Sequence, residues 1–214
     1  MATDLKKARR KPEPKDSEPE PAWEIARLFP PQGQWSEEDY LALDTNRLVE
    51  LSDGFIEVLP MPTMAHQLIV NYLCDMLKSF AATSKPKLGT TLFAALPIRL
   101  WKEKFREPDV VFMLAEHASR MRNEFWNGAD LVMEIVSDKN RSHDIKKKRE
   151  EYARAGIPEY WIIDPKEQTI TVLVLTGKRK AYAVFGKFRM GERAKSKLLP
   201  GFGIDVTEAL SQKP

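Results

Sequence analysis

A run of apolar residues in the stretch DLVMEIVS, at 130–137, most constrains what this chain can fold into. Its length and its branched side chains are typical of a buried strand, yet a carboxylate, Glu134, stands at its centre. A carboxylate on a buried strand is costly unless it is paired, hydrogen-bonded or bound to a cation. The sequence therefore predicts a sheet in which Glu134 has a specific partner.

A second predicted strand, REPDVVFML at 106–114, repeats this pattern with Asp109. Alternation along a strand places each acid on one face with apolar neighbours two residues away. Carboxylate oxygens are the ligands that Mg²⁺ prefers in proteins. Two such acids on neighbouring strands are expected to converge on a divalent ion.

The helix predicted at 142–157 has a lysine where its apolar stripe should continue. The stripe runs from Ile145 to Tyr152, and Lys148 occupies a position between them. One interpretation is an exposed intrahelical pair with Asp144, which contributes only about 0.3 kcal/mol. The other is catalytic: two carboxylates hold Mg²⁺ or Mn²⁺, and a lysine ammonium neutralises charge on a scissile phosphate. Two carboxylates that hold a metal ion, together with a lysine, suit phosphodiester hydrolysis.

Periodicity and turn residues predict the remaining elements. Ser36 is a predicted N-cap, Ser52-Asp53-Gly54 predicts a turn between two strands, and helical spacing predicts a long helix from residue 64. Further strands are predicted at 90–101, 159–164, 169–176 and 180–186. Helices packed against a mixed sheet make an α/β or α+β fold.

Length and composition limit the class of protein. The chain has 214 residues, 43% of them hydrophobic, which suits one domain with a core. Residues 1–22 mix charge and proline without periodicity, which predicts a disordered tail ahead of a single domain at 23–214. No apolar stretch suits a membrane span or a signal peptide, so we expect a soluble, cytoplasmic protein with no membrane partner.

The basic residues are unevenly distributed, although the net charge is only +3. Between Lys178 and Lys197 eight basic residues outnumber one acid, Glu192, and a second basic cluster spans Lys139 to Arg149. Such patches are typical of contacts with a phosphate backbone, and equally of a solvated face. Charge alone therefore leaves nucleic-acid binding open.

Several motifs together resemble a known family. They are EPD at 107–109, EIVS at 134–137, the D, K and Y at 144, 148 and 152, and YARAGIPEYWIIDP at 152–165. These segments are similar to the Uma-type family of putative restriction endonucleases, a bacterial branch of the PD-(D/E)XK nuclease superfamily. The resemblance extends from about Trp35 to Leu210.

The resemblance implies a restriction-endonuclease-like core, a mixed β-sheet flanked by helices, with Asp109 and Glu134 as metal ligands. The usual superfamily pattern has a lysine two residues after the second acid, where this chain has Val136. In this family the lysine is found on the following helix, and Lys148 is the matching position. Glu50 matches a family acid and is a candidate auxiliary metal ligand. The alternative for Glu50 is a strand-end acid paired with a neighbouring base.

His66 is the last candidate, as a phosphate contact or proton shuttle, although a histidine at a helix start is often a surface or capping residue. The favoured function is a Mg²⁺-dependent DNA endonuclease with Asp109, Glu134, Lys148, Glu50 and His66 at its site. Two alternatives stay open: a catalytically silent nucleic-acid-binding or protein-interaction module on the same fold, and a nuclease acting on RNA or branched DNA. Superfamily nucleases that cut both strands are often dimers, so the resemblance also suggests a homodimer.

Overall fold

The computed structural model describes residues 28–45, 47–83, 87–137, 141, 143–177 and 181–213. Gln32–Pro214 form one compact unit. The predicted tail at 1–22, and Lys178, Arg179 and Lys180 of the basic segment, lie outside the described residues. No helix in the described ranges is long and apolar enough to cross a membrane.

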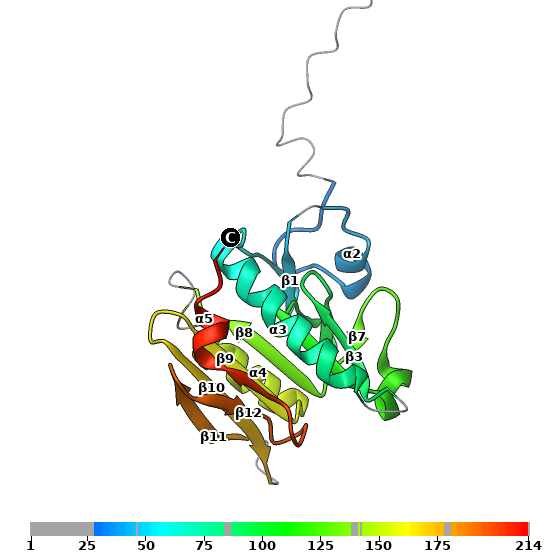
Figure 1. The fold of residues 1–214 in the computed structure, drawn as a ribbon. Coiled ribbons are helices and arrows are strands. Elements are labelled where there is room, and N and C mark those ends of the chain that lie inside the picture. The colour runs from blue at the N-terminus through cyan, green and yellow to red at the C-terminus, as the bar shows by residue number, and fades with distance from the viewer. Residues whose placement is uncertain are drawn as a thin grey trace, which may run out of the picture. The chain divides into compact units, whose positions relative to one another are not determined.

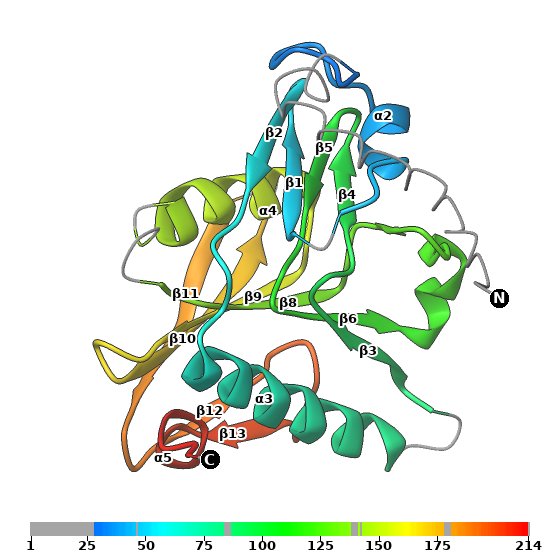
Figure 2. The same cartoon turned by 90° about the horizontal axis from the view of Figure 1, so that it is seen from above.

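A six-stranded sheet runs through the middle of this unit (Figures 1 and 2). Its strands, in spatial order, are β11 (Ala181–Arg189), β10 (Thr169–Thr176), β9 (Glu159–Asp164), β8 (Leu131–Ile135), β6 (Val110–Leu114) and β3 (Gly89–Phe93). Strand β8 is parallel to β9 and antiparallel to β6, so the sheet is mixed. The predicted fold class, mixed sheet flanked by helices, is confirmed.

One face of this sheet is covered by a long helix and by C-terminal elements, as Figure 2 shows. These elements are α3 (Met64–Ala82), β12 (Arg193–Lys195), β13 (Gly203–Asp205) and α5 (Val206–Leu210). Alternate residues of β8, namely Leu131, Met133 and Ile135, are buried against the apolar stripe of α3. The two periodicities, 2.0 for a strand and 3.6 for a helix, bring these apolar rows together.

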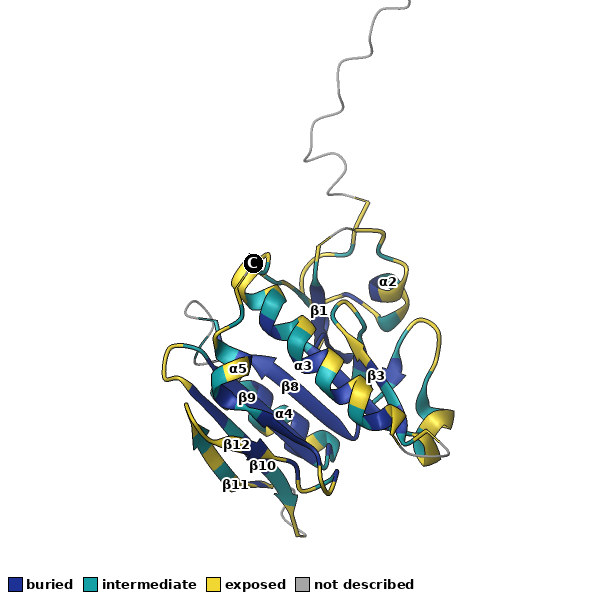
Figure 3. Ribbon diagram, viewed as in Figure 1, coloured by how far each residue is buried: buried dark blue, intermediate teal, exposed yellow. Residues whose placement is uncertain are grey.

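The opposite face is covered by α4 (Lys148–Ala155), which continues from a π-helical turn, η2 (His143–Lys147). Val132 of β8 is buried here with Tyr152 of α4. Glu134 points to the same side, as strand alternation predicts. Figure 3 shows β8 as a buried strand between the two layers of helix.

A second, five-stranded sheet adjoins the α4 side. Its strands, in spatial order, are β2 (Phe55–Val58), β1 (Val49–Ser52), β5 (Lys104–Arg106), β4 (Ile98–Trp101) and β7 (Trp126–Asn127). Helix α2 (Glu37–Leu41) starts at the predicted N-cap Ser36. The predicted turn between β1 and β2 is also present: Asp53 and Gly54 have φ of 52° and 83°, the left-handed conformation that a tight hairpin needs.

The predicted strand at 90–101 is wrong in extent, because the structure divides it into β3 and β4 of different sheets. The predicted strand at 106–114 is divided in the same way, between β5 and β6. Pro97 and Pro108 lie at the two breaks, and proline donates no hydrogen bond to a ladder. Because the chain passes from one sheet to the other at Pro108, Asp109 lies where the sheets meet. A 3₁₀ helix, η1 (Ala115–Arg120), follows β6.

Candidate active site

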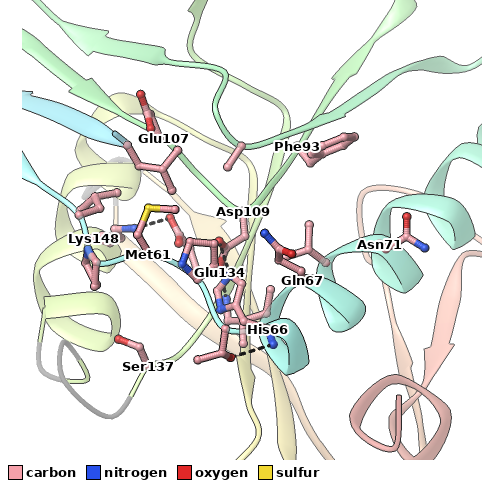
Figure 4. Close-up of a pocket in the computed structure, with 18 residues that line it drawn as sticks. Met61, His66, Gln67, Asn71, Phe93, Glu107, Asp109, Glu134, Ser137 and Lys148 are labelled. Atoms are coloured by element: carbon pink, nitrogen blue, oxygen red, sulfur yellow. Dashed lines mark hydrogen bonds and ion pairs between the residues drawn. The ribbon is translucent and has the colours of Figure 1, made fainter. Parts of the chain in front are cut away.

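A cavity of about 800 Å³ adjoins the first turns of α3 and α4, where β6 begins and β8 ends. Asp109, Glu134, Lys148 and His66 all line it (Figure 4). The structure therefore brings four of the five predicted site residues together. The fifth, Glu50, does not line the cavity.

Asp109 is oriented by contacts with two elements. Its Oδ2 accepts a hydrogen bond from the backbone N–H of Ile135 at 2.7 Å, and its Oδ1 lies 2.8 Å from Nε2 of His66. In the β6–β8 ladder Val110 pairs with Met133, so Asp109 lies beside the end of β8 that carries Glu134. Sheet register thus explains why two acids 25 positions apart in the chain share one cavity wall.

His66 reaches Asp109 because Thr63 begins the helix. The Thr63 hydroxyl accepts a hydrogen bond from the His66 backbone N–H at 3.2 Å, which is the N-cap contact of α3. This cap places His66 in the first turn, and its side chain is only 21% exposed. Of the two roles considered for His66, the structure therefore favours a place at the site over a free surface position.

Glu134 has two partners on α4. Its Oε1 lies 2.9 Å from Nζ of Lys148 and accepts a hydrogen bond from the Tyr152 hydroxyl at 2.5 Å. Lys148 and Tyr152 are four residues apart, so they lie on one face of the helix and both meet the strand. Burial, reinforced by the charge of Glu134, raises the pKa of Tyr152 well above its usual value, so the hydroxyl remains a donor.

Lys148 is 4% exposed, which explains its place on the apolar stripe. The cation lies in the interface between α4 and β8 because it pairs there with Glu134. The alternative of an exposed pair with Asp144 does not describe this lysine, which is buried. The side chain of Asp144 itself lies outside the described residues.

Glu50 is fully buried on β1. Its Oε2 accepts a hydrogen bond from Arg106 at 2.6 Å, its Oε1 accepts one from the Glu107 backbone N–H at 3.0 Å, and Lys148 Nζ lies 3.8 Å from Oε1. Glu50 therefore lies between two cations rather than at the cavity wall. The pairing of Glu50 with Arg106 agrees with the alternative of an acid paired with a neighbouring base. Glu50 is, however, buried much more deeply than is expected of an acid at the end of a strand.

Arg106, which the sequence analysis missed, is the centre of a buried ionic network. It pairs with Glu50, with Glu57 at 2.7 Å and with Glu151 at 2.7 Å, so it connects β1, β2 and α4. Burial by itself lowers the pKa of the guanidinium, but the three carboxylates raise it above its usual value, and Arg106 stays charged. The only sequence signal was a charged residue directly before the EPD motif.

Glu107 is a second residue without a predicted role. It lines the cavity, is 8% exposed, and its Oε2 has no hydrogen-bond partner among the described residues. Burial raises the pKa of Glu107 to about 7, and the negative charge of Glu50 acts in the same direction. One residue of the cavity wall therefore has a carboxyl oxygen that is shielded from solvent and has no partner in the described part of the chain.

The donor set fits a hard divalent cation. Asp109 and Glu134 offer carboxylate oxygens, and Mg²⁺ is commonly held by one or two protein carboxylates, with water and substrate phosphates as its other ligands. In the ranges that the structure describes, no three His, Cys, Asp or Glu side chains cluster closely enough to hold a metal by themselves. The residues present thus suit Mg²⁺ or Mn²⁺ better than a metal that requires four protein ligands.

Replacing Tyr152 by phenylalanine tests the strength of the contact with Glu134. We expect the free energy of unfolding to fall by about 1.5–3 kcal/mol, the contribution of a hydrogen bond to a charged group. Urea denaturation followed by circular dichroism measures this loss. Tyr182→Phe is the matched control, because that hydroxyl donates to the neutral carbonyl of Ile157 and should contribute about 0.5–1.5 kcal/mol. Equal losses would contradict a special contribution from the Glu134 charge.

Comparison with known proteins adds independent information. The model of a family named Uma2 and described as "Putative restriction endonuclease" matches residues 37–207, a range that contains every candidate site residue. Among solved structures, a protein from Anabaena variabilis ATCC 29413, described as a putative nuclease belonging to DUF820, is similar with a TM-score of 0.67. The two chains are 18% identical over 83% of this chain and 98% of that one, a likeness that shows the fold. No curated protein matches the chain.

Proposed function

We propose, because this chain belongs to the Uma2 family of putative restriction endonucleases, that it hydrolyses phosphodiester bonds of DNA with the help of Mg²⁺ or Mn²⁺. Its nuclease-like fold supports the reaction class. One observation carries the proposal: Lys148 Nζ lies 2.9 Å from Glu134 in a cavity that Asp109 also lines. Two acids and one lysine are thus gathered from three separate elements.

Asp109 and Glu134 are the residues that would hold the cation. A bound divalent cation supplies positive charge that stabilises the negative charge on the phosphate in the transition state. Asp109 is kept in place by the Ile135 amide and by His66, and Glu134 by Lys148 and Tyr152. Because these contacts exist before substrate arrives, little reorganisation is needed when charge develops.

Lys148 is assigned to orient the attacking water and to neutralise charge on the phosphate. Lys148 is only 4% exposed, so its electrostatic interactions are stronger than in bulk solvent. A lysine in the usual superfamily position cannot serve here, because that position is Val136, which belongs to the apolar core. Lys148 on the helix therefore supplies the positive charge that the strand does not provide at position 136.

Glu50 and His66 are assigned positioning roles. Glu50 lies 3.8 Å from Lys148 and is itself paired with Arg106. It therefore holds the Lys148 ammonium in place without lining the cavity. We therefore prefer this role for Glu50 to that of an auxiliary metal ligand. His66 holds the Asp109 carboxylate at the distance of a hydrogen bond.

Incubation of the purified chain with plasmid, single-stranded DNA, branched DNA and RNA tests the proposal. We expect cleavage of DNA in Mg²⁺ or Mn²⁺ and none in EDTA, because the carboxylates alone cannot stabilise charge on a phosphate. Cleavage of RNA or of branched DNA in preference to plasmid would favour the second nuclease alternative. Binding without cleavage in any metal would favour the silent module. Sedimentation of the same sample tests the proposed homodimer.

A further inference from the structure

The cavity extends beyond the proposed catalytic groups along α3. Figure 4 shows Gln67 and Asn71 of α3, and Phe93 at the end of β3, on the side of Asp109 away from Lys148. An ion and a phosphate need charged or polar walls, and neither requires an aromatic ring. This end of the cavity therefore suits a group of the ligand other than the phosphate that meets the carboxylates.

Phe93 is held close to the proposed catalytic groups. It pairs with Val110 in the β3–β6 ladder, and the next residue, Ala94, donates its backbone N–H to the Asp109 carbonyl at 3.2 Å. The residue is nevertheless 52% exposed. Phe93 thus lines the cavity with half of its surface open, so the ring is accessible to a ligand bound there.

Helix α3 supplies hydrogen-bonding groups to the same part of the cavity. Gln67 and Asn71 are one turn apart on α3, and both are exposed and line the cavity. The Gln67 side-chain amide makes no hydrogen bond to another described residue, whereas Asn71 donates to Asp75 at 3.3 Å. A free amide offers two N–H donors and a carbonyl acceptor, which match the edges of nucleobases.

A cation completes this arrangement. Nζ of Lys78 lies 5.3 Å from the centre of the Phe93 ring, within the range of a cation–π contact. Lys78 therefore covers one face of the ring, which leaves the other face for a base, and brings a positive charge near the strand that carries this base. Aromatic ring, amide and cation together complement a nucleotide better than they complement a folded protein surface.

We propose that Phe93 and Gln67 form a subsite for one unpaired nucleobase next to the scissile phosphate, so that the substrate is single-stranded DNA at the position of the cut. Phe93 stacks on the face of the base, and Gln67 contacts its edge. A base inside a duplex has both faces covered by its neighbours, so it cannot meet Phe93 unless it leaves the stack. The inference rests on the proposed function and specifies its substrate.

The test measures stacking directly and without cleavage. In an Asp109→Asn background, oligonucleotides carrying the fluorescent base 2-aminopurine are titrated with protein, because stacking on an aromatic ring quenches this base. We expect quenching with single strands and with duplexes that contain unpaired bases, and little with full duplexes. Phe93→Ala should weaken single-strand binding by about five- to a hundredfold, the range for one base–aromatic stack.

Two further variants separate stacking from loss of structure. Phe93→Tyr keeps an aromatic ring and should restore both quenching and affinity. Phe55→Ala is the matched control, since Phe55 is also 52% exposed but does not line the cavity. The inference is overturned if Phe93→Ala binds and quenches like its parent, or if full duplexes bind as tightly as single strands and with equal quenching.

Cleavage by the otherwise unchanged chain is scored separately on the same oligonucleotides in Mg²⁺. Cleavage of duplex and single strands at equal rates, unaffected by Phe93→Ala, would overturn this subsite and leave the proposed function standing. Phe93-dependent quenching without any cleavage would support the subsite and contradict the proposed function. The two failures are therefore distinguishable.

Discussion

Asp109→Asn and Glu134→Gln are each expected to reduce DNA cleavage to the level of the unchanged chain in EDTA. Both substitutions keep the size of the side chain and an oxygen that can accept a hydrogen bond, from Ile135 in the first case and from Tyr152 in the second. Each removes a negative charge that the cation requires. For Asp109→Asn the loss should therefore come from metal binding rather than from unfolding. Glu134→Gln also removes one partner of the buried pair with Lys148, so we expect that metal-free variant to lose about 3–5 kcal/mol of stability as well, and its cleavage is compared at a temperature at which it is folded.

Calorimetric titration with Mn²⁺, together with plasmid cleavage, measures this effect. We expect Mn²⁺ binding to weaken strongly in both variants, while circular dichroism shows a folded chain. Glu116→Gln is a suitable control, because Glu116 is an exposed acid on η1 that does not line the cavity. Mn²⁺ binding that is unchanged in both site variants would refute the assignment of Asp109 and Glu134 as metal ligands.

Lys148→Met is expected to slow cleavage by about a hundredfold or more, the size expected for removing one preorganised electrostatic group. The change also leaves Glu134 buried with only part of its charge compensated. We therefore expect the metal-free protein to lose about 3–5 kcal/mol of stability, as when one partner of a buried ion pair is removed. Cleavage must be compared at a temperature at which thermal unfolding shows both proteins to be folded.

Lys146→Met is a better control for Lys148→Met than a substitution of the adjacent lysine, Lys147→Met, would be. Lys146 is exposed on η2, whereas Lys147 pairs with Glu57 at 2.8 Å and is thereby connected to Arg106. Lys146→Met should retain most of the activity. If Lys148→Met cleaves at the unchanged rate, the catalytic lysine has been misplaced. If both variants lose activity equally, the helix contributes only a general positive charge.

Local patterns in the sequence predicted much of this site. The alternation of apolar residues around Glu134 predicted a buried strand with a partnered acid, and the structure has both. The interruption of the apolar stripe at Lys148 predicted an unusual lysine, and it is buried against that strand. These predictions succeeded because side-chain direction repeats every 2.0 residues along a strand and every 3.6 along a helix, whatever the rest of the fold does.

Predictions that needed the path of the chain between elements were less successful. Apolar content alone could not indicate that 90–101 turns at Pro97 and enters a second sheet. Nor could it indicate that Glu50 is fully buried, because its partner Arg106 lies 56 positions away. An acid on a short strand has the same local sequence whether it is exposed or enclosed.

The sequence by itself determined that Asp109, Glu134 and Lys148 are chemically unusual, because each of these charges disturbs a short periodic pattern that can be read locally. Only the tertiary structure decided which of them meet. His66 and Asp109 are 43 positions apart, and Arg106 and Glu151 are 45 apart, so their contacts depend on sheet register and on how α3 and α4 pack. The presence of Phe93 and Gln67 in one cavity depends on the same packing. The separation between the end of a strand and the face of a helix is set by how the layers assemble, and neither segment determines it alone.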